Sequence, residues 1–118
     1  MTQEEKELLL KDLCARLQDK VMIYLYTSSE ITGSAIVLNS SIYGFIEDVL
    51  NNSPYEIKEI KPYLRPLSSM TKEEKAYYFA IDEEPVKCID WLNEHHFDYR
   101  GLIEKGLALE APEDMYKQ

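Results

Sequence analysis

The chain has 118 residues, of which 45% are hydrophobic and 30% charged, and its formal net charge is -9. This length fits one domain, and the hydrophobic content is sufficient for a core, which disfavours disorder of the whole chain. An acidic surface repels phosphate, so the net charge also disfavours direct binding to nucleic acid or to anionic lipid. We therefore expect a single domain over residues 1–118 that binds neither nucleic acid nor a membrane.

The first residues are charged and amphipathic, and they lack the basic and then apolar pattern of a signal peptide. No apolar run reaches the roughly 18–20 residues that a membrane helix needs. Cys14 and Cys88 belong to no CxxC or metal-ligand pattern, and each lies on the apolar side of a predicted helix. We therefore expect a cytoplasmic protein in which both thiols are free and buried.

An amphipathic helix is predicted over residues 3–17. Thr2 and Glu5 have the spacing of a capping box, in which each side chain would bind a free amide of the first turn. Most charged residues, Asp12 and Arg16 among them, fall off the apolar stripe and are expected to face solvent. The stripe consists of Leu9, Leu10, Leu13, Cys14 and Leu17.

Four short strands are predicted next, because these segments are rich in β-branched and aromatic residues or alternate in polarity. Gly33, near the start of the second strand, is a candidate for a turn or a bulge. Close spacing of four strands favours an antiparallel meander of three to four strands, which could be curled or barrel-like. The predicted strands are residues 21–26, 31–38, 41–49 and 55–63.

Two helices are predicted after the sheet. Thr71 and Glu74 form a second potential capping box, which would open a helix ending at about residue 81. Pro85 suits the first position of the next helix, which would extend to about residue 96.

A short final helix is predicted to begin at Asp98 and to end at Gly106, which would act as a left-handed terminator. Residues 112–118 are expected to be a flexible tail. The fold class is therefore α+β, with an N-terminal helix, a small antiparallel sheet and two to three C-terminal helices.

The candidate partner-binding residues are concentrated near the C-terminus. Aromatic and Arg side chains are favoured at the centres of protein contacts, and this segment holds the only Trp and both His of the chain. A packing role is the favoured interpretation for Trp91 and Phe97, whereas the roles of Tyr99 and Arg100 stay open. The partner-binding set is Trp91, His95, His96, Tyr99 and Arg100.

No catalytic, metal-binding or cofactor motif stands out. Adjacent residues on a helix diverge by about 100°, so His95 and His96 cannot face one ion from a regular helix. Histidines at the end of a helix would instead interact favourably with its negative pole. We expect no cofactor and no enzymatic activity, and two alternatives remain. One is a small metal-dependent or hydrolytic enzyme that uses His95 or His96 with nearby carboxylates, and the other is an acidic inhibitor of a DNA-binding protein.

Four segments carry a resemblance, and together they cover less than half of the chain. They are MTQEEKELLLKDLCARL at residues 1–17, IKPYLRPLSSMT at 60–71, DWLN at 90–93 and FDYRGLIEKGLALEAP at 97–112. In these segments the chain resembles small uncharacterised proteins of gut anaerobes that are associated with prophages and other mobile elements. The resemblance implies an accessory protein and supplies no catalytic residue. Together with the residues above, it leads us to expect a non-enzymatic protein–protein interaction module.

Overall fold

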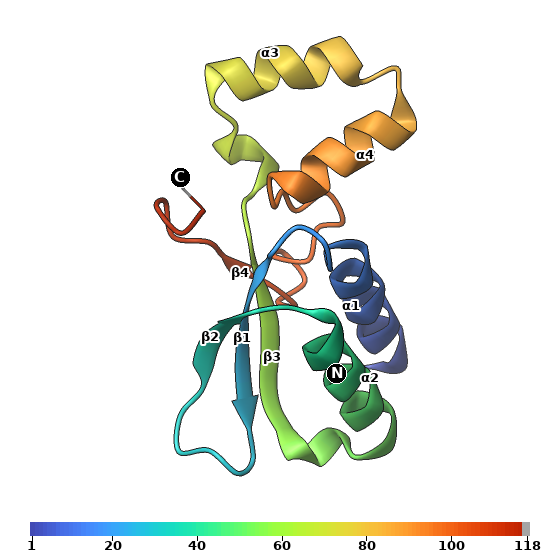
Figure 1. Cartoon of the computed structure of the whole chain (residues 1–118), viewed down its shortest axis with the longest axis vertical. Coiled ribbons are helices and arrows are strands. Elements are labelled where there is room, and N and C mark those ends of the chain that lie inside the picture. Colours follow the sequence, from blue (N-terminus) through green and yellow to red (C-terminus); the bar gives the residue numbers. More distant parts are fainter. Residues whose placement is uncertain (117–118) are drawn as a thin grey trace.

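A computed structural model describes residues 1–116, which form four α-helices and a small sheet in a molecule of 45 × 27 × 25 Å (Figure 1). The α+β class is confirmed. No helix in this part of the chain has the length and apolar character that crossing a bilayer would require. The helices are α1 (Gln3–Ala15), α2 (Ser40–Asn52), α3 (Lys72–Ile81) and α4 (Pro85–Glu94). The strands are β1 (Met22–Thr27), β2 (Ser34–Val37), β3 (Ile57–Leu64) and β4 (Leu109–Glu110).

The sheet has the strand order β2-β1-β3-β4 and is open. β1 pairs with both β2 and β3 in antiparallel fashion, whereas β4 pairs with β3 in parallel. The four strands agree with the predicted number, but the sheet is mixed where an antiparallel one was predicted. Of the shapes left open by the sequence, a barrel is not formed. The parallel strand was missed because it has only two residues and lies 45 positions after β3.

Gly33 lies directly before β2, in the hairpin that joins β1 to β2, and it is in close contact with Tyr24. A Cβ atom at this position would clash with the end of the Tyr24 ring, so a glycine here leaves room for the ring where it lies. Its φ angle is not in the left-handed region. The residue therefore serves side-chain packing on the hairpin, and it is neither part of the register shift found at Tyr26/Thr27 nor a left-handed turn residue.

Both predicted capping boxes are present. The Thr2 hydroxyl accepts a hydrogen bond from the Glu5 amide at 3.0 Å, and the Glu5 carboxylate accepts one from the Thr2 amide at 2.8 Å. Thr71 and Glu74 make the same reciprocal pair at the start of α3. Two amides of each first turn are thereby satisfied, which fixes where α1 and α3 begin.

The third predicted strand, residues 41–49, is helical and belongs to α2. Asn39 caps this helix, because its side-chain oxygen accepts a hydrogen bond from the Ile42 amide at 2.9 Å. Ile46, Val49 and Leu50 are buried at helical spacing. The β-branched and aromatic content of the segment had favoured a strand, and the tertiary contacts of this apolar face override that propensity.

Two apolar clusters of unequal size hold the molecule together. The main core lies where α1 and α2 pack against one face of the sheet, with Leu13, Ile46 and Ile23 all fully buried. A smaller group, which we call the hairpin cluster, lies between α3 and α4 and the adjoining chain. Its buried members are Ile81, Cys88, Trp91, Leu92 and Phe97.

The predicted final helix is replaced by turns. The Asp98 carboxylate accepts hydrogen bonds from the amides of Leu102 and Ile103, both at 2.9 Å, and Gly106 has a φ of +74°. The Asp98 side chain and Gly106 thus bracket the segment as predicted, but the seven residues between them form turns and not a helix.

The segment expected to be a flexible tail is anchored by Tyr116. Its hydroxyl donates to the Tyr63 carbonyl at 2.7 Å and accepts from the Met22 amide at 2.9 Å. Because Met22 and Tyr63 belong to neighbouring strands, the C-terminal segment is fastened across β1 and β3. The expectation was therefore wrong for Tyr116, and residues 117–118 lie outside the described part of the chain.

Candidate functional site

The helices α3 and α4 form a hairpin that extends beyond the end of the sheet (Figure 1). Pro85 occupies the first position of α4, as predicted. Arg65, which directly follows β3, connects the hairpin to the sheet, because its guanidinium donates two hydrogen bonds to Glu74 at 2.9 and 2.7 Å. This bidentate pair lowers the pKa of Glu74 to about 2. The hairpin is therefore joined to the sheet by a charged contact as well as by its apolar cluster.

Trp91 is the centre of the hairpin cluster and is 9% exposed. Its ring centroid lies 5.5 Å from that of Tyr77, 5.7 Å from that of Phe97 and 4.6 Å from that of His95. Aromatic neighbours at these distances hold the indole in one orientation. The packing role favoured for Trp91 and Phe97 is what the structure shows for both residues.

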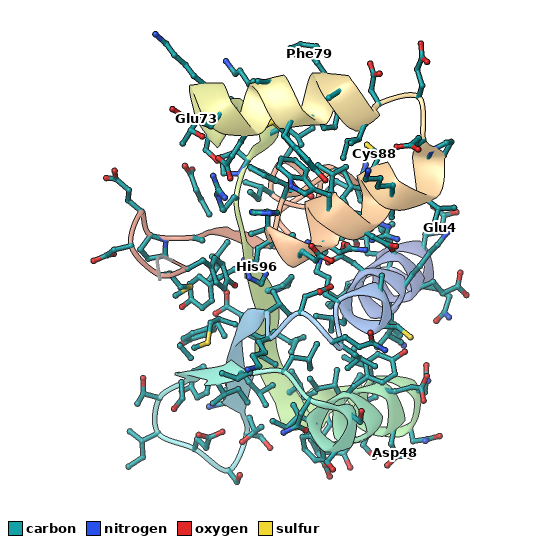
Figure 2. All side chains as sticks on the ribbon, turned by 45° about the horizontal axis from the view of Figure 1, so that its top comes forward. Glu4, Asp48, Glu73, Phe79, Cys88 and His96 are labelled. Atoms are coloured by element: carbon teal, nitrogen blue, oxygen red, sulfur yellow. The ribbon has the colours of Figure 1, made fainter. Side chains whose placement is uncertain are left out.

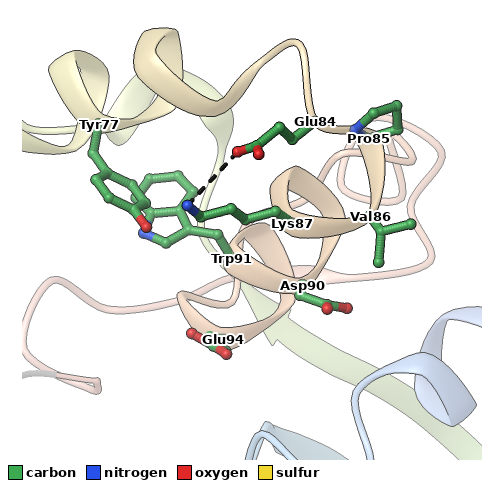
Figure 3. Close-up of a pocket in the computed structure, with 8 residues that line it drawn as sticks. All are labelled: Tyr77, Glu84, Pro85, Val86, Lys87, Asp90, Trp91 and Glu94. Carbon is green, nitrogen blue, oxygen red and sulfur yellow. Dashed lines mark ion pairs between the residues drawn. The ribbon is translucent and has the colours of Figure 1, made fainter.

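A hollow of about 660 Å³ opens beside Trp91, and we call it the α4 groove. Tyr77 and Trp91 form an aromatic wall, and Pro85 and Val86 supply apolar surface at the start of α4 (Figure 3). Val86 is 76% exposed. The eight residues of the groove are Tyr77, Glu84, Pro85, Val86, Lys87, Asp90, Trp91 and Glu94.

The α4 groove is acidic. Of its charged side chains, Glu84, Asp90 and Glu94 are carboxylates and Lys87 is the cation. The Lys87 ammonium lies 3.6 Å from a Glu84 carboxylate oxygen, as the dashed line in Figure 3 shows. Asp90 and Glu94 lie one helical turn apart and leave the groove with a net negative charge.

The negative charge continues on the other side of α4. A second hollow, of about 410 Å³, shares Asp90 and Glu94 with the α4 groove and adds Asp19. Burial raises the pKa of Asp19, and the nearby charges of Glu94 and Asp90 raise it further, against the opposing effect of Arg16. Asp90 and Glu94, which separate the two hollows and which we call the acidic ridge, therefore lie close to other negative charges. A bound cation would reduce the repulsion between these carboxylates.

The five predicted partner-binding residues fall into two groups. Trp91 lines the α4 groove. His95, whose ring packs at a tilt against Trp91, has a 41% exposed side chain with Nδ1 3.8 Å from a Glu74 carboxylate oxygen. His96, Tyr99 and Arg100 lie instead at the base of the hairpin. Only Trp91 and His95 are thus brought together beside the groove.

Arg100 belongs to a polar network that we call the Asp12 clamp, which consists of Asp12, Arg16 and Arg100, and Tyr99 packs against it. Asp12 and Arg16 are fully buried, and the Arg100 side chain is 17% exposed. The Asp12 carboxylate accepts hydrogen bonds from Arg16 at 2.9 Å and from Arg100 at 2.7 Å. Arg16 also donates to the Phe97 carbonyl at 2.7 Å. The Tyr99 ring lies 5.2 Å from the Arg16 guanidinium and 4.7 Å from that of Arg100. The clamp joins α1 to the chain that follows α4.

Two expectations for α1 were wrong. Asp12 and Arg16 were expected to face solvent, but both are fully buried, because each provides the other's counter-charge inside the protein. Cys14 was expected to be buried and is exposed, whereas Cys88 is buried as predicted. The buried face of α1 therefore includes Asp12 together with Leu9 and Leu13, and Cys14 lies outside it.

His96 is buried where the end of α4 meets the sheet (Figure 2), and it is held in the left-handed region with a φ of 63°. Burial, together with the nearby charge of Arg16, lowers its pKa to about 4. The expected interaction of a charged His96 with the helix pole is therefore wrong, since this imidazole is neutral at pH 7. Its ring stacks on Tyr116 at 3.7 Å.

No group of three or more metal-ligating side chains converges anywhere in residues 1–116. In chemical terms, the α4 groove offers aromatic faces and carboxylates, which together suit the recognition of a cation.

Most residues of the α4 groove were missed by the sequence analysis. A signal was present, because Lys87, Asp90, Trp91 and Glu94 recur at spacings of three and four and so share one face of a helix. Tyr77 could not be connected to this face, because only the packing of α3 on α4 brings it there. Comparison of the chain with protein-family models, with curated proteins and with solved structures gives no match.

Proposed function

We propose that the protein is a non-enzymatic interaction module that binds another protein through the α4 groove. The observation that supports this proposal is the combination, in one hollow, of an aromatic wall and three carboxylates. Aromatic side chains held in fixed orientations lose little conformational entropy on binding, and they are enriched at the centres of protein contacts. The hairpin that carries the groove extends beyond the sheet, so a partner can approach it without meeting the sheet (Figure 1).

The charge of the groove selects a basic segment as the occupant. A Lys or Arg side chain can lie over the exposed ring of Tyr77, beside the small exposed part of Trp91, a contact worth about 0.5–2 kcal/mol depending on desolvation. The same cation can pair with Asp90 and Glu94 at the rim. An acidic segment would add to the repulsion already present on this ridge, so charge both attracts the right partner and rejects the wrong one.

Trp91 provides a direct readout, because it is the only Trp in the chain and it lines the groove. We would titrate the protein with short Arg-containing peptides and follow the fluorescence emission of Trp91. Binding should shift the emission and weaken as ionic strength rises. Peptides with Glu in place of Arg should leave the emission unchanged.

A matched pair of variants assigns the binding to the groove. Glu94→Gln removes one carboxylate from the ridge, and Glu104→Gln removes the same charge from an exposed site outside the groove. We expect Glu94→Gln to weaken peptide binding about 3–10-fold, as for one charge-assisted contact, and Glu104→Gln to have no effect. Equal affinities of the two variants, or an emission that no Arg peptide changes at millimolar concentration, would refute the proposal.

The resemblance to proteins of prophages and mobile elements supports the narrower proposal that the partner belongs to such an element or to its host. A protein that binds DNA through a basic surface has the chemistry that the groove requires. If the partner is of this kind, duplex DNA should compete with the protein for it. Competition by DNA would identify an acidic inhibitor, whereas binding unaffected by DNA would point to a basic segment outside any DNA-binding surface.

A further inference from the structure

The pairing of β2 with β1 determines which backbone groups of β2 face away from the sheet and can bind another strand. Leu38 donates its amide hydrogen to the Val21 carbonyl at 2.9 Å, and β1 and β2 pair in register from Met22 opposite Val37 onward. Hydrogen-bonded pairs alternate along an antiparallel ladder, so Ile36 turns its amide and carbonyl toward β1. Ala35 and Val37 therefore direct theirs away from the sheet.

This edge has none of the chemical features that usually block further pairing. Charged residues, prolines and bulges on edge strands prevent association between sheets, and Ser34–Val37 contains no charge and no proline. The register shift of the sheet lies between β1 and β3. Ala35 and Val37 are exposed, Val37 to 46%. The shortness of β2 limits how many bonds a second strand can form but does not prevent it from pairing.

The opposite edge of the sheet is different. β4 has only two residues, one of them Glu110, and Pro112 follows shortly after. A charge and a nearby proline are the features that discourage pairing. Of the two edges, β2 is the one that is open to another strand.

We propose that β2 pairs with β2 of a second copy of this chain, antiparallel and about a twofold axis. The outward-facing groups set the register, with Ala35 opposite Val37 of the other copy and Val37 opposite its Ala35. Each of these two pairs exchanges both backbone hydrogen bonds. Ile36 then meets Ile36 on the axis, and the two four-stranded sheets become continuous. A twofold axis requires such self-complementary pairing, and this register provides it.

Two copies of this acidic chain repel one another less at the β2 edge than at their acidic faces. Each chain carries a formal net charge of -9, so two copies repel wherever their acidic surfaces meet. The segment 21–45, which contains β1 and β2, has Glu30 as its one charged residue. Contact through β2 therefore brings two acidic chains together at their neutral part. It also leaves α3 and α4 free, since they lie at the other end of the molecule (Figure 1).

Sedimentation velocity over a range of concentrations tests the dimer. The full chain should show a monomer–dimer equilibrium, and Ala35→Pro should raise its Kd at least tenfold, because proline removes a donor that faces away from β1. Val37→Lys, which keeps every amide and places a charge at the edge, should have the same effect. Circular dichroism should show both variants to be folded. A chain that is monomeric up to about 0.5 mM, or a dimer that neither variant weakens, would overturn the proposal.

Cross-linking tests the register. In a background with Cys14→Ser and Cys88→Ala, Ile36→Cys should give a covalent dimer on mild oxidation, because residue 36 faces itself across the axis. Ala35→Cys is the matched control and should cross-link much less, since residue 35 faces residue 37 of the other copy. Equal cross-linking of the two variants would contradict the register. If the pure protein stays monomeric and Ile36→Cys cross-links only to a different protein in a lysate, the second copy is excluded as the occupant.

Discussion

Removing Asp12 should destabilise the fold more than any other loss of a single carboxylate. Asp12 and Arg16 are both fully buried and joined at 2.9 Å, and Arg100 binds the same carboxylate at 2.7 Å. In Asp12→Ala the Arg16 guanidinium keeps only its hydrogen bond to the Phe97 carbonyl and stays in the interior without a counter-charge. Breaking a buried ion pair in this way typically costs about 3–5 kcal/mol.

Urea unfolding, followed by circular dichroism, measures this cost. With a slope of about 1.5 kcal/mol per molar urea, a loss of 4 kcal/mol lowers the midpoint by about 2–3 M. Asp48→Ala, which removes an exposed helical carboxylate, should change the free energy of unfolding by less than about 1 kcal/mol. The double variant Asp12→Leu/Arg16→Met should recover much of the loss, because it leaves no charge buried at residue 16. A loss below about 1 kcal/mol in Asp12→Ala would show that the clamp is not a buried ion pair.

Two further predictions concern the C-terminal part of the chain. The pKa of His96 is lowered from 6.5 to about 4, so the folded state favours the neutral imidazole, and stability is fully present above pH 6.5 and lost as the pH falls toward 4. Between pH 7 and pH 5 the free energy of unfolding should fall by about 2 kcal/mol more than it does in His96→Asn. Glu74, whose pKa is lowered from 4.5 to about 2, loses its contribution mainly below pH 4.5, so it does not account for this difference. Tyr116→Phe removes two hydrogen bonds between a half-buried hydroxyl and the backbone and should cost about 1–3 kcal/mol in urea unfolding, while Tyr55→Phe, at a 77% exposed position, should cost nothing measurable.

Local signals in the sequence predicted the elements that local interactions define. The capping boxes at Thr2 and Thr71 placed the starts of α1 and α3, because a cap binds amides within three residues of itself. The helix α2 also had a cap, Asn39, and apolar residues at helical spacing. In the prediction, its β-branched and aromatic content was given more weight than these signals, which led to a strand. Local sequence leaves helix and strand both open here, and the packing of the segment on the sheet favours the helix.

The candidate site could be predicted only in part, because it depends on contacts between distant segments. Trp91 and His95 were singled out from composition, and both lie beside the α4 groove. Arg100, in contrast, is turned away from solvent by its hydrogen bond to Asp12. Asp12 is 88 positions away, so no local pattern reveals this pairing. A charged residue is assigned to the surface by default, and this assignment fails wherever two opposite charges are buried together.

The unequal sizes of the main core and the hairpin cluster have a thermodynamic consequence. Free energies of local opening follow the amount of apolar surface that each unit buries, so the amides of α3 should exchange their hydrogens before those of β1 and β3. The wall of the α4 groove contains Tyr77 from α3, and it therefore exists only while α3 is closed on α4. A ligand of the groove binds that closed state, so at a free concentration L well above its Kd it should slow every opening that separates α3 from α4, by RT ln(1 + L/Kd). Openings confined to the sheet, which leave the hairpin closed, should not respond to the ligand.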